Sequence, residues 1–176
     1  MLTPGRPAPA LGFETVAHGR CEIGASDRGN GTLVVFYRGA HCPICRNQLK
    51  ELDDQIGDFA IRGIAVIAVS GDTLERAKET TDAMQIIRLP VGYGLDIKAA
   101  RDDWGLYVST AREGTEEPAF FNEPGLFWIA GDGTVVFSLV QSLPQIRPSA
   151  PAILRAIDKI TQAGAPPRGS YTGDLP

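Results

Sequence analysis

The chain has 176 residues, of which 43% are hydrophobic and 22% charged, and its formal net charge is −4. This length suits a single domain whose core needs no disulfide bridges. The mild acidity argues against a nucleic-acid-binding surface or a polybasic membrane anchor, and no apolar run approaches the ~20 residues of a membrane-spanning helix.

The first half of the chain predicts a hairpin followed by two β-α units. Segments 13–16 and 20–23 flank His18-Gly19 and are typical of two short antiparallel strands. The apolar runs Thr32–Tyr37 and 63–69 predict strands buried on both faces. A helical pattern follows each run, over residues 44–59 and 74–84. The candidate N-caps of the second helix are Ser70, Asp72 and Thr73.

The second half predicts a loop over 89–96 and a short helix that becomes extended within 97–108. Residues 125–130 and 134–140 flank Gly-Asp-Gly, which indicates a β-hairpin, and residues 149–163 have an amphipathic helical pattern. We therefore predict one α/β domain over residues 1–163, with a central mixed sheet flanked by helices and an N-terminal β-hairpin. The Pro/Gly-rich tail, residues 164–176, is predicted to be disordered.

Two cysteines, Cys42 and Cys45, lie where the first buried strand gives way to a helix. A thiolate at a helix start is stabilised by unpaired backbone N–H groups and the helix dipole. Pro43 suits the first helical turn, and Cys45 follows one turn later on the same side, within reach of a disulfide with Cys42. His41 and Arg46 flank the pair and can add positive charge. A strand, a loop and then C-P-x-C at a helix start is the thioredoxin-type redox pattern.

The sequence also allows other roles for these cysteines. Two buried, unreactive thiols are disfavoured by the spacing. Together with His18 and Cys21, the pair supplies four ligands of structural-zinc type, but a buried strand separates the two halves and Pro43-Ile44 suits helix entry better than a zinc knuckle. We therefore predict no metal and no cofactor. The N-terminus has no recognisable leader, and with only three cysteines the chain is predicted to be cytoplasmic.

Several segments resemble the redoxin branch of the thioredoxin superfamily, and most closely peroxiredoxin-like proteins of the alkyl hydroperoxide reductase/thiol-specific antioxidant type. They are PGRPAPALGFETV, LVVFYRGAHCPICRNQLKEL, GIAVIAVSGD, LPVGYGLD and EPGLFWIAGDGTVVF. The resemblance covers residues 1–163. It implies a thioredoxin-like fold and a helix-start cysteine that reduces peroxides or disulfides at the expense of a thiol donor.

The sequence departs from the peroxiredoxin pattern P-x-x-x-T/S-x-x-C at two places. Arg38 stands in place of the proline and Cys42 in place of the threonine, while Cys45 takes the position of the peroxide-attacking cysteine. The family's arginine before the GLF strand is replaced by Pro124, the position of the cis-proline in thioredoxin-like reductases. Arg38 or Arg46 is a candidate substitute for that arginine, and Glu123 is a candidate substrate contact.

The leading hypothesis is therefore a thiol-dependent peroxidase that cycles between a Cys42/Cys45 dithiol and a disulfide. The alternatives are a thioredoxin-like protein-disulfide reductase and a zinc-bound or redox-sensing binding module. Helix-end stabilisation and exposure favour Cys42 as the attacking thiol, whereas the family register favours Cys45. The expected partners are a peroxide or disulfide substrate and a thioredoxin- or glutathione-type electron donor, without nucleic acid or membrane. Homodimer formation is left open.

Overall fold

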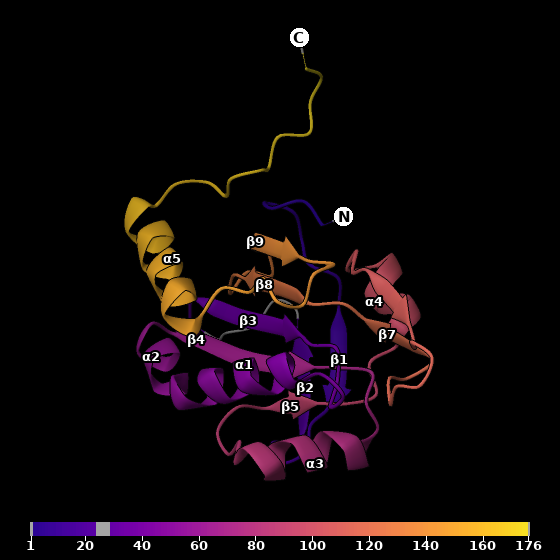
Figure 1. The fold of residues 1–176 in the computed structure, drawn as a ribbon. Coiled ribbons are helices and arrows are strands. Elements are labelled where there is room, and N and C mark those ends of the chain that lie inside the picture. The colour runs from indigo at the N-terminus through magenta and orange to yellow at the C-terminus, as the bar shows by residue number, and fades with distance from the viewer. Residues whose placement is uncertain (1, 24–28, 176) are drawn as a thin grey trace.

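The computed structural model describes residues 2–23 and 29–175. Its centre is a five-stranded mixed sheet with the strand order β5-β4-β3-β8-β9 (Figure 1). Strands β3, β4 and β5 are parallel, whereas β8 and β9 run antiparallel to their neighbours. Their bounds are β3 Gly31–Phe36, β4 Ile64–Val69, β5 Val91–Gly92, β8 Gly125–Ile129 and β9 Val135–Val140.

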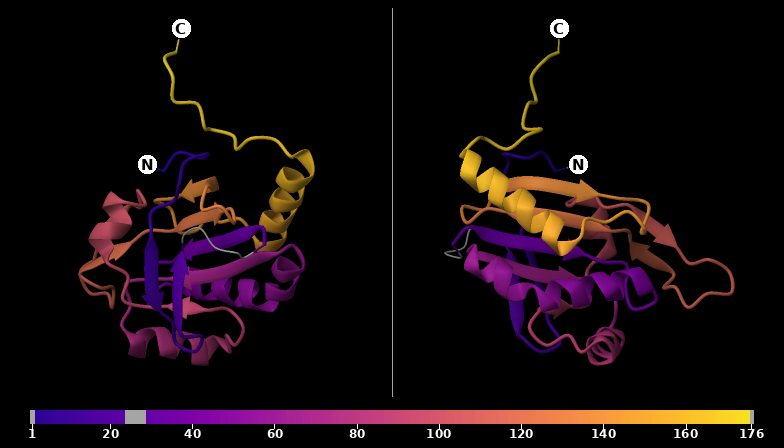
Figure 2. Two further views of the ribbon diagram at one scale, coloured as in Figure 1. Left: turned by 180° about the vertical axis from the view of Figure 1, so that it is seen from behind. Right: turned by 60° about the vertical axis from the view of Figure 1, so that its left-hand side comes forward.

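Helices and a hairpin cover the two faces of this sheet (Figure 2). One face packs against α1 (Pro43–Asp54), α2 (Ile56–Ile61) and α5 (Ala150–Ala163). The other face packs against α4 (Ile97–Asp102) and the hairpin of β1 (Leu11–Glu14) and β2 (Arg20–Ile23). The remaining elements are α3 (Leu74–Met84), which neighbours α1, and the small pair β6 (Val108–Thr110) and β7 (Phe120–Asn122).

The continuous apolar run of β3 is explained by burial on both faces. Leu33 and Val35 face the helices α1 and α5, whereas Val34 and Phe36 face the hairpin and α4. Because side chains alternate along a strand, a central strand covered on both sides needs apolar residues at every position. The predicted mixed sheet, its flanking helices and the N-terminal hairpin are confirmed.

Three details differ from the sequence-based elements. The predicted helix 44–59 is divided at Gln55, where the backbone leaves helical geometry (φ −102°, ψ 11°) between α1 and α2. The predicted loop 89–96 contributes β5 to the sheet edge. Residues 164–175 continue beyond α5 without a helix or strand, and their disorder stays a prediction. Over the described ranges, none of the helices has the length and apolar character needed to cross a bilayer.

Asp53 fixes α1 to the segment that leads into β5. Its side chain is buried, and one oxygen, Oδ1, accepts from the backbone amides of Ile87, Arg88 and Leu89 at 3.2, 2.6 and 2.7 Å. These three amides lose their acceptor if the carboxylate is removed. The contact therefore holds in place the helix that carries both cysteines.

We expect Asp53→Ala to lower the free energy of unfolding by about 2–4 kcal/mol, because it leaves buried donors unpaired. The neighbouring Asp54 makes an exposed pair with Lys50 at 2.8 Å, so Asp54→Ala should cost under about 0.5 kcal/mol. Urea denaturation of both variants measures the difference. Equal losses for the two would contradict this role of Asp53.

Candidate redox site

Cys42 is the N-cap residue of α1. Its backbone is extended (φ −104°, ψ 103°), and its Sγ accepts from the Cys45 amide at 3.4 Å. Pro43 occupies the first helical turn, where a missing N–H leaves no bond unmade. The sequence-based position of the pair at the helix start is therefore confirmed, and the two cysteines lie close to each other.

Both cysteines are reduced thiols in a buried environment. Cys42 is 3% exposed and Cys45 is fully buried, and both belong to the core between the sheet and α1/α5. The sequence favours Cys42 as the more exposed thiol, but the two exposed fractions differ little. Only a small reagent can reach these sulfurs without local opening.

The other two candidate zinc ligands, Cys21 and His18, do not lie beside Cys42 and Cys45. Cys21 belongs to the core on the opposite face of the sheet, in the β1–β2 hairpin, and His18 is exposed in the turn of that hairpin. No group of three or more His, Cys, Asp or Glu side chains with metal-binding geometry occurs within residues 2–23 and 29–175. The four residues of the zinc hypothesis are thus not brought together.

Arg147 contacts the buried Cys45 sulfur. Its Nη2 donates to Cys45 Sγ at 3.1 Å, its Nη1 donates to Gln48 Oε1 at 2.6 Å, and its Nε donates to the Pro144 carbonyl at 2.8 Å. The next turn of α1 supplies Glu51, which accepts from the Ala150 amide at 3.1 Å. Gln48 and Glu51, three residues apart on α1, thus hold the loop before α5 and orient the Arg147 guanidinium toward the thiol pair.

The surroundings move the pKa values of the two thiols in opposite directions. Hydrogen bonds from the Cys45 thiol, the Cys45 amide and the Arg38 guanidinium, with the positive charge of Arg147, lower the pKa of Cys42 against the opposing effect of burial. Burial, together with its hydrogen bond to Cys42, raises the pKa of Cys45. The reduced site therefore holds a Cys42 thiolate beside a protonated Cys45.

Arg38 belongs to a nearly buried ion-pair cluster. Its guanidinium lies 3.1 Å from Glu117 Oε1 and 3.2 Å from Glu123 Oε2, and it stacks over the Phe121 ring with 4.8 Å to the centroid. Ser109 Oγ donates to the other oxygen of Glu123 at 2.7 Å. Two carboxylates compensate Arg38, so it supplies less net positive charge to the thiols than Arg147. Glu123 contacts this arginine, and its role as a substrate contact stays a prediction.

The prediction of a cis bond before Pro124 is wrong. No cis peptide bond occurs among the described residues, so the Glu123–Pro124 bond is trans. Pro124 leads directly into β8, and its carbonyl accepts from the Gln141 amide at 3.0 Å. The Glu123 amide already donates to the Tyr107 carbonyl at 2.8 Å. The backbone that a reductase would offer to an extended substrate is therefore used within the fold.

Asp72 holds the loop that precedes Cys42, and it is not the helix cap that the sequence suggested. Its Oδ2 accepts from the Ala40 amide at 2.8 Å and from Ser70 Oγ at 3.0 Å, whereas Thr73 caps α3. Gly39 in this loop has a φ of +130° and lies against the Asp72 carboxylate. A Cβ added at position 39 would lie 2.8 Å from Asp72 Oδ1. Asp72, which follows β4, thus fixes the conformation of the loop that leads into α1.

His41 and Arg46 flank the two cysteines in the chain. Both line a groove between the start of α1 and α3. The His41 ring contacts Phe121 edge-on at 4.7 Å, and burial and the charge of Arg38 lower its pKa to about 4. The imidazole is therefore neutral near pH 7. Among the described residues, no hydrogen bond joins the Arg46 side chain to either sulfur, and its role as a substitute for the family arginine stays a prediction.

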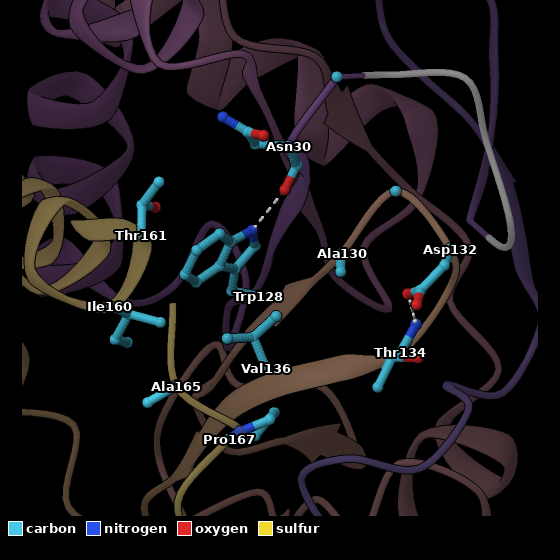
Figure 3. Close-up of a pocket in the computed structure, with 12 residues that line it drawn as sticks. Asn30, Trp128, Ala130, Asp132, Thr134, Val136, Ile160, Thr161, Ala165 and Pro167 are labelled. Atoms are coloured by element: carbon cyan, nitrogen blue, oxygen red, sulfur yellow. Dashed lines mark hydrogen bonds between the residues drawn. The ribbon is translucent and has the colours of Figure 1, made fainter. Parts of the chain in front are cut away.

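A larger cavity lies at the other end of the sheet. It has a volume of about 790 Å³ and is lined by residues that include Asn30, Trp128, Asp132 and Ile160 (Figure 3). Asn30 precedes β3, whereas Cys42 follows it, so the whole length of the central strand separates this cavity from the thiols. The cavity takes no part in the chemistry at the cysteines.

A mixed sheet with two cysteines at the start of the helix after its middle strand is the architecture of the thioredoxin-like redoxins. A family model, the AhpC/TSA family, matches residues 4–138, and the chain belongs to this family. The predicted resemblance is thereby confirmed.

Individual relatives agree with this assignment. The chain is 34% identical over 106 residues to "Putative peroxiredoxin Rv2521" of Mycobacterium tuberculosis (strain ATCC 25618 / H37Rv), which is 60% of this chain and 66% of the relative. The match thus spans slightly less than two thirds of that relative.

Solved structures show the same fold. A peroxiredoxin-like protein from Aquifex aeolicus has a TM-score of 0.72 at 14% identity, covering 90% of this chain and 88% of its own. A reduced 2-Cys peroxiredoxin of Plasmodium vivax has a TM-score of 0.69 at 20% identity, covering 93% and 99%. The thioredoxin-like fold class is therefore confirmed.

We expect Cys42 to be the first thiol alkylated by iodoacetamide, since the thiolate is the nucleophile. Its reactivity should persist below the free-cysteine pKa of about 8.5 and decline only as pH falls through the lowered pKa. In Arg147→Gln the loss of positive charge should raise that pKa, so the decline should begin at higher pH.

Thiolate absorbance at 240 nm and peptide mapping of the alkylated protein measure both effects. Arg155→Gln is the matched control, because Arg155 is exposed on α5. Alkylation of Cys45 before Cys42, or identical profiles for Arg147→Gln and the unsubstituted protein, would contradict this assignment.

Proposed function

We propose that this protein is a thiol-dependent peroxidase in which Cys42 attacks the peroxide and Cys45 resolves the product. The observation that carries the proposal is the Cys42 thiolate at the N-cap of α1, beside Cys45 and the arginine that contacts it, in a chain of the AhpC/TSA family. The low exposure of both sulfurs suits a small oxidant.

In the first step the Cys42 thiolate attacks the O–O bond of the peroxide. An S–O bond forms, the O–O bond breaks and Cys42 becomes a sulfenic acid. The leaving oxygen takes the proton of the Cys45 thiol and departs as water or an alcohol. The hydrogen bond between the two thiols in the reduced site places the Cys45 proton beside the reacting sulfur.

In the second step Cys45 attacks Cys42 Sγ. Cys45 became a thiolate when it gave up its proton in the first step, and Arg147, which donates to its sulfur at 3.1 Å, stabilises that charge. The Cys45 thiolate forms the S–S bond, hydroxide leaves the sulfenic acid, and a thiol donor must supply two electrons to restore the dithiol.

A protein-disulfide reductase is the second candidate, and C-P-x-C at a helix N-terminus favours it. Against it stand the trans Glu123–Pro124 bond, the occupied backbone of Glu123 and the burial of both sulfurs, which keep a protein disulfide away from Cys42. The identity of the donor, homodimer formation and a cytoplasmic location stay predictions.

We expect Cys45→Ser to form a sulfenic acid on Cys42 that dimedone traps after one equivalent of hydrogen peroxide, while Cys42→Ser forms none. Serine at position 45 keeps a hydroxyl that can donate to Cys42, so the thiolate is retained. Intact-protein mass spectrometry measures the adduct. An adduct on Cys45 in Cys42→Ser would reverse the roles, and insulin reduction without peroxide consumption would establish the reductase.

Arg147→Ala should slow peroxide consumption by about tenfold to a hundredfold, because it removes a charge-assisted hydrogen bond and a positive charge from the reacting pair. Arg155→Ala should leave the rate unchanged. A competition assay with a peroxidase of known rate measures the second-order constant. A rate in Arg147→Ala within twofold of the unsubstituted protein would remove Arg147 from the mechanism.

A further inference from the structure

The loop between β6 and β7, residues 111–119, supplies a side chain to the segment that leads into Cys42. Its Glu117 lies 79 residues from Arg38 in the chain, yet Glu117 Oε1 accepts from Arg38 Nη2 at 3.1 Å. Both side chains are nearly buried, with 11% of Glu117 and 12% of Arg38 exposed. The Arg38 guanidinium in turn donates to the Cys42 sulfur. Glu117 is therefore connected to the reacting sulfur through one arginine.

Glu123 also contacts Arg38, but in a different way. Its Oε2 lies 3.2 Å from Arg38 Nε. Among the described residues, neither of these two atoms has a hydrogen-bond partner, so the contact is an ion pair without hydrogen-bond geometry. Such a pair balances charge, whereas a hydrogen bond weakens steeply when its angle changes and therefore fixes direction. Of the two acids, Glu117 supplies the directional contact.

The Phe121 ring and Glu117 together determine where the Arg38 donors point. The guanidinium carbon lies over the ring, 4.8 Å from its centroid, so the ring limits movement of the guanidinium toward that side. Rotation of the guanidinium within its own plane stays free unless an acceptor holds one of its nitrogens. Glu117 Oε1 is such an acceptor. With one nitrogen held there, the direction of the donor to Cys42 is fixed as well, because the guanidinium is rigid and planar.

Glu117 is itself held within its loop. Its Oε2 accepts from the Arg112 amide at 3.0 Å and from Thr115 Oγ1 at 3.4 Å. The hydrogen bond from the Arg112 amide lowers the pKa of Glu117, so this carboxyl is ionised near pH 7. The loop thus presents a fixed carboxylate to Arg38.

The neighbouring residue Glu116 ties the same loop to a second point of the segment. Its carbonyl accepts from Arg76 Nη2 at 3.2 Å, and Arg76 Nε lies 3.5 Å from Asp72 Oδ1. The other oxygen of Asp72 accepts from the Ala40 amide at 2.8 Å. Two consecutive loop residues therefore restrain the segment that precedes Cys42, one through an arginine of the segment and one through a buried carboxylate.

We propose that Glu117 is a positioning residue for the reaction at Cys42, because it holds the Arg38 guanidinium in the orientation that donates to the Cys42 sulfur. This inference rests on the proposed role of Cys42 as the thiol that attacks the peroxide. A donor that is oriented in advance needs no reorganisation while charge moves from the sulfur to the leaving oxygen. Glu117 acts through Arg38 and takes part in no bond that forms or breaks.

Substitutions at position 117 separate the reach of the side chain from its charge. Glu117→Gln keeps the length and an acceptor oxygen but loses the charge, whereas Glu117→Asp keeps the charge and is one methylene shorter. We expect Glu117→Ala and Glu117→Asp to slow peroxide consumption by about threefold to thirtyfold, because Arg38 then keeps only its ion pair with Glu123. Glu117→Gln should stay within about twofold of the unsubstituted protein.

The pH dependence of Cys42 alkylation by iodoacetamide gives a second readout that needs no peroxide. Loss of a donor to the thiolate should move the midpoint of this profile up by about 0.5–1 pH unit in Glu117→Ala and Glu117→Asp. If Glu117 only balanced the charge of Arg38, its removal would move the midpoint down. Glu113→Ala is the matched control, because Glu113 is an exposed acid in the same loop, and it should change neither rate nor midpoint.

A double-mutant cycle tests whether Glu117 acts through Arg38. In a protein that already carries Arg38→Gln, we expect Glu117→Ala to cause no further change in the alkylation midpoint of Cys42. The other two groups that act on this thiolate, Cys45 and Arg147, are unchanged in both proteins.

A downward shift in Glu117→Ala, or a defect in Glu117→Gln that Glu117→Asp does not share, would overturn the positioning role, since either result assigns the effect to charge. An equal effect of Glu117→Ala with and without Arg38 would overturn it too. If the unsubstituted protein consumes no peroxide while the alkylation profiles follow the expected order, the peroxidase proposal fails and the positioning role stands.

Discussion

The N-cap of α1 is the contact on which the rest of the site depends. A side chain at this position normally supplies an oxygen acceptor to the first helical amides, and loss of such a cap costs about 0.5–2 kcal/mol. Here the acceptor is the Cys42 sulfur, 3.4 Å from the Cys45 amide. A neutral thiol is a weak acceptor, whereas a thiolate is a strong one. The helix therefore favours ionisation of Cys42, and ionisation of Cys42 in turn stabilises the first turn of the helix.

The two arginines near the thiols have different electrostatic roles because their partners differ. Arg38 is paired with Glu117 and Glu123, so most of its charge is balanced within the cluster. Arg147 is held by Gln48 and by the carbonyl of Pro144, which orient it without neutralising it. Its full positive charge thus acts on the sulfurs in a site where little water screens it. The acceptors that orient Arg147 are thus neutral groups rather than acidic side chains.

The sheet, the helices and the helix-start position of the cysteines could be predicted from local patterns. The apolar run of β3, the turn residues before it and Pro43 after it depend on neighbours in the sequence, and periodicity reports such relations directly. The same holds for Thr73, one of the candidate caps, which caps α3. These parts needed no knowledge of the tertiary structure.

The electrostatic half of the site could not be found in this way. Arg147 lies 102 residues from the sulfur that it contacts, in a loop without periodicity, and its position depends on Gln48 and Glu51 of α1. Only the amphipathic pattern of α5, which places the preceding loop near α1, was available as a signal. The cis bond expected before Pro124 is absent because a position in a family pattern specifies a residue type but not the backbone contacts around it. Here the paired amide of Glu123 and carbonyl of Pro124 suit a trans bond at the start of a strand.

The burial of both thiols sets different requirements on the two halves of a redox cycle. An oxidant as small as hydrogen peroxide can reach a sulfur that is 3% exposed, so oxidation needs no dedicated binding surface. A reducing thiol is larger and must approach Cys42 along a defined direction, opposite the departing Cys45 sulfur. On the Cys45 side, Arg147 donates to the Cys45 sulfur at 3.1 Å and is itself held by Gln48 and the Pro144 carbonyl. Reduction by a larger thiol therefore requires local opening around Cys42, whereas oxidation by a small peroxide does not.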